Sequence, residues 1–365
     1  MQYKNKLFIN GEWLDGSNKE TFNVLNPASE EVLTSVASAD VEDAKKAIDA
    51  AEKAFKEWSK TSPRERSVIL RNAYELFMNK IEDFAELITL ENGKAYADAK
   101  GEALYSAEFF RWYSEEAVRA NGQISNAPAT GARIVVQYKP IGISVLVTPW
   151  NYPAAMGTRK IAPAIAAGCP VIIKPASETP LTMLELMPLL EEAGVPKGLL
   201  SVLPSRNTSK LVDHLLHDPR VRLVSFTGST EVGRKLLKGA ADQVLKTSME
   251  LGGNAPLIVF DDADINTAVE GALVAKMRNL GEACTAANRI YVHEKIAQEF
   301  KTKFSERMGA LKVGNGLDKS VDVGPLVNAE TRDKVKYFVN DALSKGAELC
   351  VGGKDGDRSN LESHH

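Results

Sequence analysis

Apolar residues recur at helical spacing through most of the first 121 positions. Asp40 is a favoured N-cap residue, and Pro63 is well placed at the first position of a helix. Asn92-Gly93 is a typical helix end. The pattern predicts one early strand, Lys6–Trp13, followed by three helices: 40–58, 63–93 and 98–121.

The segment 119–140 changes character, because helix breakers such as Gly122 and Pro128 are followed by alternation from Ile134 to Tyr138. This pattern predicts an extended β-hairpin. Such a hairpin has little core of its own, so the residues alone predict a solvent-exposed loop pair.

From Ile141 onward, short apolar runs alternate with helical patterns, which is typical of a parallel sheet covered by helices on both faces. The first series of expected strands and helices is 143–147, 154–167, 171–173, 181–193, 200–203, 207–217 and 223–226. A second α/β series follows at 257–260, 264–279, 290–292, 294–311 and 328–345. Sheets of this kind bind ligands at the carboxyl ends of their strands.

Composition narrows the class of protein. A length of 365 residues with 44% hydrophobic content suggests two or more domains, and a net charge of -3 with mixed signs does not favour nucleic acid or an anionic membrane as a partner. Cys169, Cys284 and Cys350 have neither metal-ligand nor disulfide-framework spacing, and we see no signal core or membrane-spanning run. We therefore expect a cytoplasmic protein without a metal site.

Cys284 lies among small and polar residues, between an apolar helix and a short strand. A free cysteine is usually a small buried hydrophobe, but small neighbours would also let a substrate approach a reactive sulfur. Four further motifs precede it in the chain: Thr148–Pro153, Lys174–Ser177, Phe226–Gly233 and Met249–Asn254. This ordered set resembles the aldehyde dehydrogenase superfamily, and the resemblance covers about Leu7 to Gly353.

The resemblance implies an α/β fold with two parallel-sheet domains and a projecting oligomerisation hairpin. It assigns a Rossmann-like dinucleotide-binding domain to 1–118 and 141–250, the hairpin to 119–140, and a catalytic domain to 251–353. Homodimers or homotetramers are expected for full-length members. The chain ends earlier than family members do, so we expect the catalytic domain to be truncated, and residues 360–365 have the character of a tag-derived tail.

The same resemblance implies the catalytic residues. Cys284 would attack an aldehyde, and Asn151 would donate to the oxyanion, as an oxyanion hole requires. Hydride transfer to a nicotinamide would leave a thioester, which water activated by Glu250 would hydrolyse. From the residues alone, Glu250 is equally a capping or salt-bridged carboxylate, and Asn151 equally a turn residue.

The expected cofactor is NADP or NAD, although the chain contains no G-x-G-x-x-G fingerprint. Ser177 stands where many NAD-preferring members carry Glu, so NADP is tolerated unless the neighbouring Glu178 replaces that carboxylate. The cofactor-binding residues implied by the resemblance are Thr148, Pro149, Trp150, Lys174, Ser177, Glu178, Gly228, Ser229 and Leu251.

The substrate branch that the chain most resembles is that of the succinate-semialdehyde dehydrogenases. Arg159 and Arg278 stand at that branch's arginine positions and would hold the distal carboxylate of a short semialdehyde. Both are otherwise ordinary helix-surface residues. Other interpretations stay open: a broad-specificity aldehyde dehydrogenase, a non-catalytic cofactor-binding fragment, and a thiol hydrolase or acyltransferase that would use His293 as its base.

Overall fold

The main sheet contains seven strands within the described residues, which in this computed structural model are 3–129 and 131–353. Its strand order is β11-β10-β7-β8-β9-β1-β2. The strands are β1 (Leu7–Ile9), β2 (Glu12–Leu14), β7 (Ile143–Val147), β8 (Val171–Lys174), β9 (Leu200–Val202), β10 (Val221–Gly228) and β11 (Lys246–Leu251). The predicted 360–365 tail lies outside the described residues.

The centre of this sheet is parallel. Strand β7 pairs with β10 on one side and with β8 on the other, and β8 pairs with β9. Val147 is opposite both Phe226 and Lys174, so the carboxyl ends of β7, β8 and β10 meet at one edge. Every residue of β7, β8 and β9 is buried, which explains their continuous apolar sequence.

The first predicted strand, Lys6–Trp13, is wrong as a single element. It forms two antiparallel strands, β1 and β2, and β1 adds antiparallel to β9, so the sheet is mixed. Asn10 and Gly11 at the turn have φ of 55° and 72°. Asn-Gly at two consecutive positive φ values is the favoured two-residue hairpin turn. The sequence prediction of one strand overlooked this turn signal.

The predicted helix 63–93 is also divided in two, at Asn79-Lys80. The helices that precede the hairpin are α1 (Val41–Trp58), α2 (Pro63–Met78), α3 (Ile81–Asn92) and α4 (Tyr96–Glu116), followed by the 3₁₀ turn η1 (Ala117–Arg119). Asn79 donates its backbone N–H to Glu75 and Lys80 to Phe77, so the last turn tightens and the helix ends. The predicted Asp40 cap is confirmed, since its side chain accepts from the backbone of Glu42 and Asp43.

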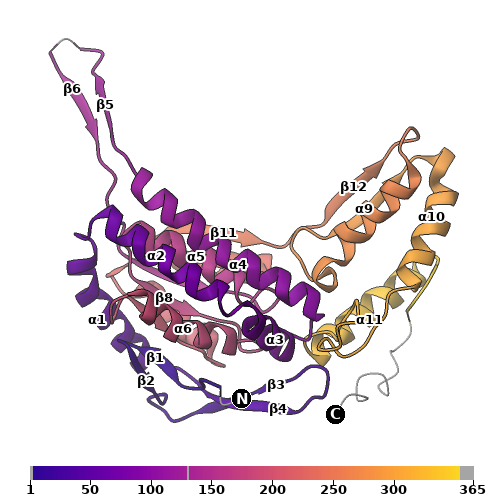
Figure 1. Ribbon diagram of the computed structural model, residues 1–365, viewed down its shortest axis with the longest axis horizontal. Coiled ribbons are helices and arrows are strands. Elements are labelled where there is room, and N and C mark those ends of the chain that lie inside the picture. The colour runs from indigo at the N-terminus through magenta and orange to yellow at the C-terminus, as the bar shows by residue number, and fades with distance from the viewer. Residues whose placement is uncertain (1–2, 130, 354–365) are drawn as a thin grey trace. The chain divides into compact units, whose positions relative to one another are not determined.

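Segment 119–140 contains the expected hairpin. Strands β5 (Gln123–Asn126) and β6 (Arg133–Val136) pair antiparallel, and every residue in both is exposed. In Figure 1 the two strands extend away from the helices and sheet of their own unit. Whether they pair with another subunit stays a prediction.

The chain folds into two compact units. Among the described residues, the first comprises 3–24, 34–81 and 102–250 without 130, and the second comprises 25–33, 82–101 and 251–353. Strands β3 (Thr21–Leu25) and β4 (Val32–Ala37) form a small two-stranded sheet. The remaining helices of the first unit are α5 (Ala155–Ala166), α6 (Leu181–Ala193), α7 (Thr208–His217) and α8 (Thr230–Asp242).

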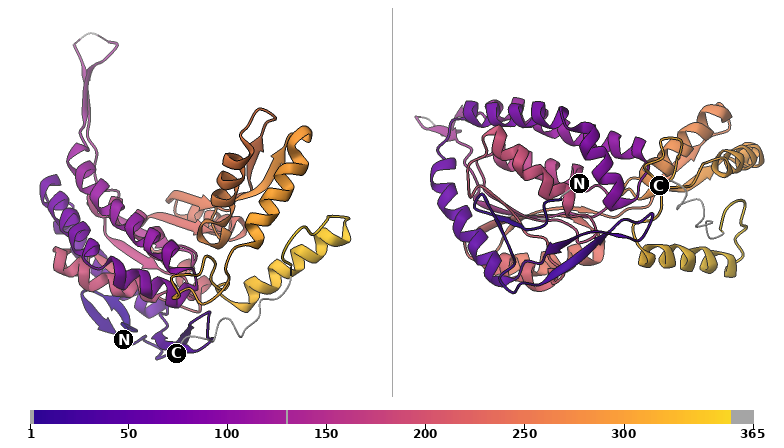
Figure 2. Two further views of the ribbon diagram at one scale, coloured as in Figure 1. Left: turned by 45° about the vertical axis from the view of Figure 1, so that its right-hand side comes forward. Right: turned by 60° about the horizontal axis from the view of Figure 1, so that its bottom comes forward.

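The second unit has a parallel strand pair, β12 (Ala255–Val259) and β13 (Ala287–Val292). Its helical elements are α9 (Ile265–Met277), the 3₁₀ turn η2 (Arg278–Gly281), α10 (Glu294–Gly309) and α11 (Ala329–Ser344). Helices α9 and α10, in orange, lie side by side (Figure 2), and their core is built on Val259, Val269, Ala272 and Phe300. The second unit also includes 25–33 and 82–101, which the predicted boundaries gave to the first domain.

Candidate active site

Three polar side chains lie at the carboxyl ends of adjacent strands in the first unit. Thr148 follows β7, Lys174 ends β8, and Thr227 is next to last in β10. The backbone N–H of Thr148 donates to the carbonyl of Lys174 at 3.2 Å, which fixes the two strand ends together. The hydroxyl of Thr227 is buried and has no hydrogen-bond partner among the described residues. A buried hydroxyl of this kind is suited to a polar ligand at the sheet edge.

Lys174 is buried, and burial lowers the pKa of its ammonium group from 10.5 to about 8, against the opposing effect of Glu178. The positive charge of Arg206 lowers this pKa further. Arg206 follows β9, and sequence reasoning missed it because no motif marks that turn. Ser177 donates a weak 3.4 Å hydrogen bond to Glu178, so the two predicted ribose-side residues contact each other.

Gly228 and Ser229 connect β10 to α8. Ser229 is the N-cap of α8 and accepts from the backbone N–H of Val232 at 3.3 Å. A Cβ at position 228 would collide with the buried ring of Phe226, so glycine allows this turn without displacing that ring. The turn therefore presents a helix N-terminus at the same sheet edge, which favours an anionic group.

The segment that carries Trp150 and Asn151 leads from β7 into α5. The hydroxyl of Thr179 donates to the Trp150 carbonyl at 3.4 Å. Glu102, which is 2% exposed, accepts from the backbone N–H groups of Ala154 and Ala155 at 2.9 and 3.2 Å. A buried carboxylate from α4 thus fixes the start of α5, three residues after Asn151. Sequence reasoning missed Glu102 because it lies in an otherwise ordinary helix.

Glu250 is next to last in β11 and forms an ion pair with Arg159 of α5. Nη2 of Arg159 lies 3.3 Å from Oε1 of Glu250, and both side chains are about half-exposed. The neighbouring Lys160 is buried and donates to the hydroxyl of Ser225 at 2.7 Å. Burial lowers the pKa of Lys160 to about 8, although the charge of Glu250 opposes this effect. The structure therefore pairs Arg159, which is predicted to bind the substrate, with Glu250, which is predicted to be the general base.

Cys284 and Arg278 belong to the second unit, and both are exposed. Cys284 follows a turn in which Asn279, Leu280 and Gly281 have φ of 58°, 58° and 76°. A leucine in the left-handed region costs on the order of 1 kcal/mol, so surrounding contacts hold this turn. Arg278 precedes the turn, and its positive charge lowers the pKa of the nearby Asp98 carboxyl, which burial raises more strongly.

Two further titratable groups lie close to Cys284 in sequence. Burial raises the pKa of the Glu282 carboxyl to about 7, although the charge of Lys94 opposes the shift. His293 accepts the backbone N–H of Lys295 at 3.3 Å through Nδ1 and so caps α10. This hydrogen bond assigns His293 a structural role at a helix start.

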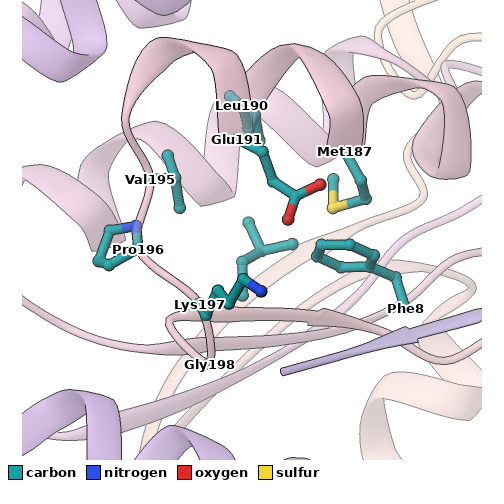
Figure 3. Close-up of a pocket in the computed structure, with 9 residues that line it drawn as sticks. Phe8, Met187, Leu190, Glu191, Val195, Pro196, Lys197 and Gly198 are labelled. Carbon is teal, nitrogen blue, oxygen red and sulfur yellow. The ribbon is translucent and has the colours of Figure 1, made fainter. Parts of the chain in front are cut away.

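A small pocket in the first unit is unrelated to these residues. Met187 and Phe8 point toward one another inside it (Figure 3). Its lining residues are Phe8, Met187, Leu190, Glu191, Val195, Pro196, Lys197, Gly198 and Leu200. None is a predicted site residue, and the pocket lies beside α6 and β1. No helix among residues 3–129 and 131–353 is both long enough and apolar enough to cross a membrane.

Comparisons with known proteins agree with the motif order. Residues 13–364 match the model of the aldehyde dehydrogenase family. The chain is 52% identical over 322 residues to a succinate-semialdehyde dehydrogenase of Paenarthrobacter nicotinovorans, covering 88% of this chain and 72% of that protein. It is 45% identical to a glutarate-semialdehyde dehydrogenase of Pseudomonas putida, covering 96% of this chain and 73% of that protein.

Solved structures give the same result for the fold. The crystal structure of an NADP-dependent enzyme of E. coli matches with a TM-score of 0.96 at 45% identity, covering 98% of this chain and 74% of that one. A betaine aldehyde dehydrogenase of Staphylococcus aureus in complex with NAD+ matches with a TM-score of 0.95 at 34% identity, covering 99% and 72%. The predicted α/β fold, similar to that of aldehyde dehydrogenases, is confirmed.

Proposed function

Because this chain belongs to the aldehyde dehydrogenase family, we propose that it oxidises a short semialdehyde, with succinic semialdehyde first, to the carboxylic acid. It is an NAD(P)-dependent aldehyde dehydrogenase with a small-molecule aldehyde as its substrate. The observation that carries the proposed substrate is Arg159, a guanidinium paired with the half-exposed carboxylate of Glu250. The Arg159 guanidinium has five N–H donors and is 40% exposed, so it can bind a substrate carboxylate in addition to Glu250.

The residues at the sheet edge fit a dinucleotide. The buried hydroxyl of Thr227, the glycine turn at Gly228 and the N-terminus of α8 form a polar, narrow surface that suits a pyrophosphate. Lys174 and Ser177 would contact the adenosine ribose. When bound, the nicotinamide accepts the hydride that the aldehyde carbon loses. The other proposed contacts are Thr148, Pro149, Trp150, Glu178, Ser229 and Leu251.

The proposed chemistry of the chain's own residues is nucleophilic. The Cys284 thiolate adds to the aldehyde carbon, while the Asn151 amide and the backbone N–H of Cys284 donate to the resulting oxyanion. Loss of hydride leaves a thioester on Cys284. Glu250 then takes a proton from water, whose oxygen attacks the thioester and releases the acid.

The finer substrate identity rests on two arginines. Arg159 and Arg278 would each donate to the carboxylate at the far end of the substrate. Relatives are named for succinate and glutarate semialdehydes, which differ by one methylene group. One methylene is a weak discriminator, worth about 1–3 kcal/mol in a pocket. We therefore propose activity toward both, with the shorter substrate preferred.

The assembly, location and domain roles are part of the same proposal. Exposed apolar residues on the β5–β6 hairpin, Ile124 and Val135 among them, support its pairing with a second subunit in a homodimer or homotetramer. The free thiols of Cys169, Cys284 and Cys350 support a reducing cytoplasm. The first unit would then bind the cofactor and the second would carry the nucleophile.

The first experiment follows the absorbance of reduced cofactor with the whole chain, succinic semialdehyde, and NAD or NADP in parallel. Turnover that disappears in Cys284→Ala and persists in Cys350→Ala would support the proposal. Butanal, which lacks the second carboxylate, tests the substrate class, since equal kcat/KM for both would indicate a broad-specificity enzyme. Cofactor binding without turnover would instead indicate a non-catalytic fragment.

A further inference from the structure

Lys94 is a fully buried lysine that the proposed chemistry does not use. It lies between α3 and α4 in the second unit, and its side chain has 0% exposure. Lysine is almost never fully buried unless its charge is paired or hydrogen-bonded. Its Nζ donates to the side-chain oxygen of Asn279, which is itself 1% exposed. This bond connects 82–101 to the segment that leads to Cys284.

The backbone around Lys94 is held by close packing against the chain at 314–325. A Cβ added at Gly316 would collide with the carbonyl of Lys94, and one added at Gly324 would collide with the carbonyl of Gly93. Tyr96 also donates its backbone N–H to the Gly316 carbonyl at 2.8 Å. The backbone of Lys94 is therefore held in place, and the side chain extends from it so that the ammonium group reaches Asn279.

Asn279 is held from several directions. Its backbone N–H donates to Oδ2 of Asp98 at 2.9 Å, and the backbone of Leu280 hydrogen-bonds to the same carboxyl group. Its side-chain amide donates to the carbonyl of Glu282 at 3.3 Å, and Glu282 returns its backbone N–H to the Asn279 carbonyl at 2.8 Å. These bonds stabilise the left-handed turn of Asn279, Leu280 and Gly281, which an unsupported chain would rarely adopt.

Cys284 lies between this turn and a second fixed point. Ala286 and Ala287, which lead into β13, are 2% and 5% exposed, and Ala286 donates its backbone N–H to Ala283 at 3.1 Å. A Cβ at Gly253 would lie 3.3 Å from the Cys284 carbonyl, so that backbone also packs against the segment. With both ends held, the backbone at Cys284, and therefore the position of its Cα–Cβ bond, is fixed within the second unit.

We infer that Lys94 and Asp98, through Asn279, are positioning residues that hold the Cys284 thiol in its attacking orientation. This inference rests on the proposed function only in assigning Cys284 as the nucleophile. Lys94 and Asp98 do not touch the reacting atoms. Their effect is to hold a left-handed turn that sets the path of the chain into Cys284.

Two substitutions test the network in the whole chain. Lys94→Met keeps the length of the buried side chain and removes its donors. Asn279→Gly keeps the backbone free to adopt positive φ and removes the side-chain link, so it separates the hydrogen bonds from backbone strain. Lys100→Met, at a half-exposed lysine of α4 that pairs with Glu82, is the matched control.

We expect both network variants to lower kcat about tenfold or more, because a misdirected nucleophile slows the chemical step, while KM for aldehyde and cofactor changes less than about twofold. Asp98→Asn retains an oxygen that can accept the Asn279 N–H, so we expect it to restore most of the kcat that Asp98→Ala loses. Two results would overturn the positioning role. One is a rise in KM that accompanies the fall in kcat, and the other is a kcat for Asp98→Asn as low as that for Asp98→Ala.

Backbone hydrogen exchange provides a second measurement that needs no turnover. Exchange at 279–286 should accelerate in both network variants and stay unchanged in α10 and in Lys100→Met. If the wild-type chain oxidises no aldehyde, the proposed function fails for this polypeptide, and the exchange result still decides whether the network holds the Cys284 segment. Unchanged exchange at 279–286 in Asn279→Gly would overturn the inference.

Discussion

Nη2 of Arg159 lies 3.3 Å from Oε1 of Glu250, so the residue proposed to hold the substrate is paired with the residue proposed to activate water. The side chains are 40% and 45% exposed, and pairs this exposed are worth about 1 kcal/mol or less. A substrate carboxylate can therefore compete for Arg159 at small cost.

Replacing this arginine tests the substrate class. Arg159→Met should lower kcat/KM for succinic semialdehyde roughly tenfold to hundredfold, since a hydrogen bond between charged groups contributes about 1.5–3 kcal/mol. The kcat/KM for butanal should change little, because butanal has no distal carboxylate. Steady-state kinetics with both aldehydes measure the difference. Arg111→Met, at an exposed ion pair on α4, is the control, and equal losses for both aldehydes would argue against a carboxylate contact.

We expect the preference for NAD or NADP to depend on Ser177. A carboxylate at this position would repel the 2′-phosphate of NADP. The hydroxyl oxygen of Ser177 already lies 3.4 Å from Oε2 of Glu178. Ser177→Glu should weaken NADP binding about tenfold or more and leave NAD binding within about twofold. Titration of the reduced cofactors by fluorescence measures both. Ser177→Ala controls for the lost hydroxyl, and a Glu variant that loses NAD equally would contradict the assignment.

The ammonium group of Lys174 should lower the free energy of unfolding at pH 7 and strengthen cofactor binding. Burial lowers its pKa from 10.5 to about 8, so the folded state disfavours the charged lysine, and wild-type stability should rise as pH increases from about 8 to 10.5. Below pH 8 the buried charge costs on the order of 1–3 kcal/mol. Lys174→Met should therefore be more stable than wild type at pH 7 and yet bind cofactor more weakly.

Urea unfolding at pH 7 and pH 9.5 measures the first effect, and cofactor titration measures the second. Lys210→Met, at an exposed position on α7, should leave both unchanged. A Lys174→Met variant that is less stable at pH 7 would show that the ammonium group makes net favourable contacts in the folded protein.

Glu282 gives the opposite dependence on pH. Its carboxyl pKa is raised from 4.5 to about 7, so the folded state favours the protonated form, and stability is lost as pH rises from about 4.5 to 7. The full shift corresponds to about 3 kcal/mol, and partial exposure reduces this to roughly 1–2 kcal/mol. Glu282→Gln should be more stable than wild type at pH 8 and equal to it near pH 4.5.

Chemical unfolding of the two proteins across pH 4.5 to 8 measures this difference. Glu306→Gln, an exposed carboxylate on α10, should follow the wild-type curve. Parallel curves for wild type and Glu282→Gln would mean that Glu282 titrates in the folded protein as it does in the unfolded chain.

The sequence by itself determined the elements and the family. The apolar runs at 143–147 and 181–193 match β7 and α6 residue for residue, because a 5-residue apolar run has the length of a buried strand and a 13-residue one has the length of a helix. The order of the motifs identified the family without any contact being known. The early elements were harder, since the Asn10-Gly11 turn and the Asn79-Lys80 break are decided by one or two residues.

Tertiary structure decided which distant residues meet. Arg159 and Glu250 are 91 positions apart, and Lys94 and Asn279 are 185 positions apart. No period or local motif connects such pairs, because their contact depends on how strands and helices pack after the chain has folded. The buried carboxylate of Glu102 and the left-handed turn before Cys284 also depend on contacts between residues that are distant in the sequence. Their polar groups are stable only where distant segments supply hydrogen-bond partners and exclude water, and sequence near those residues does not encode that environment.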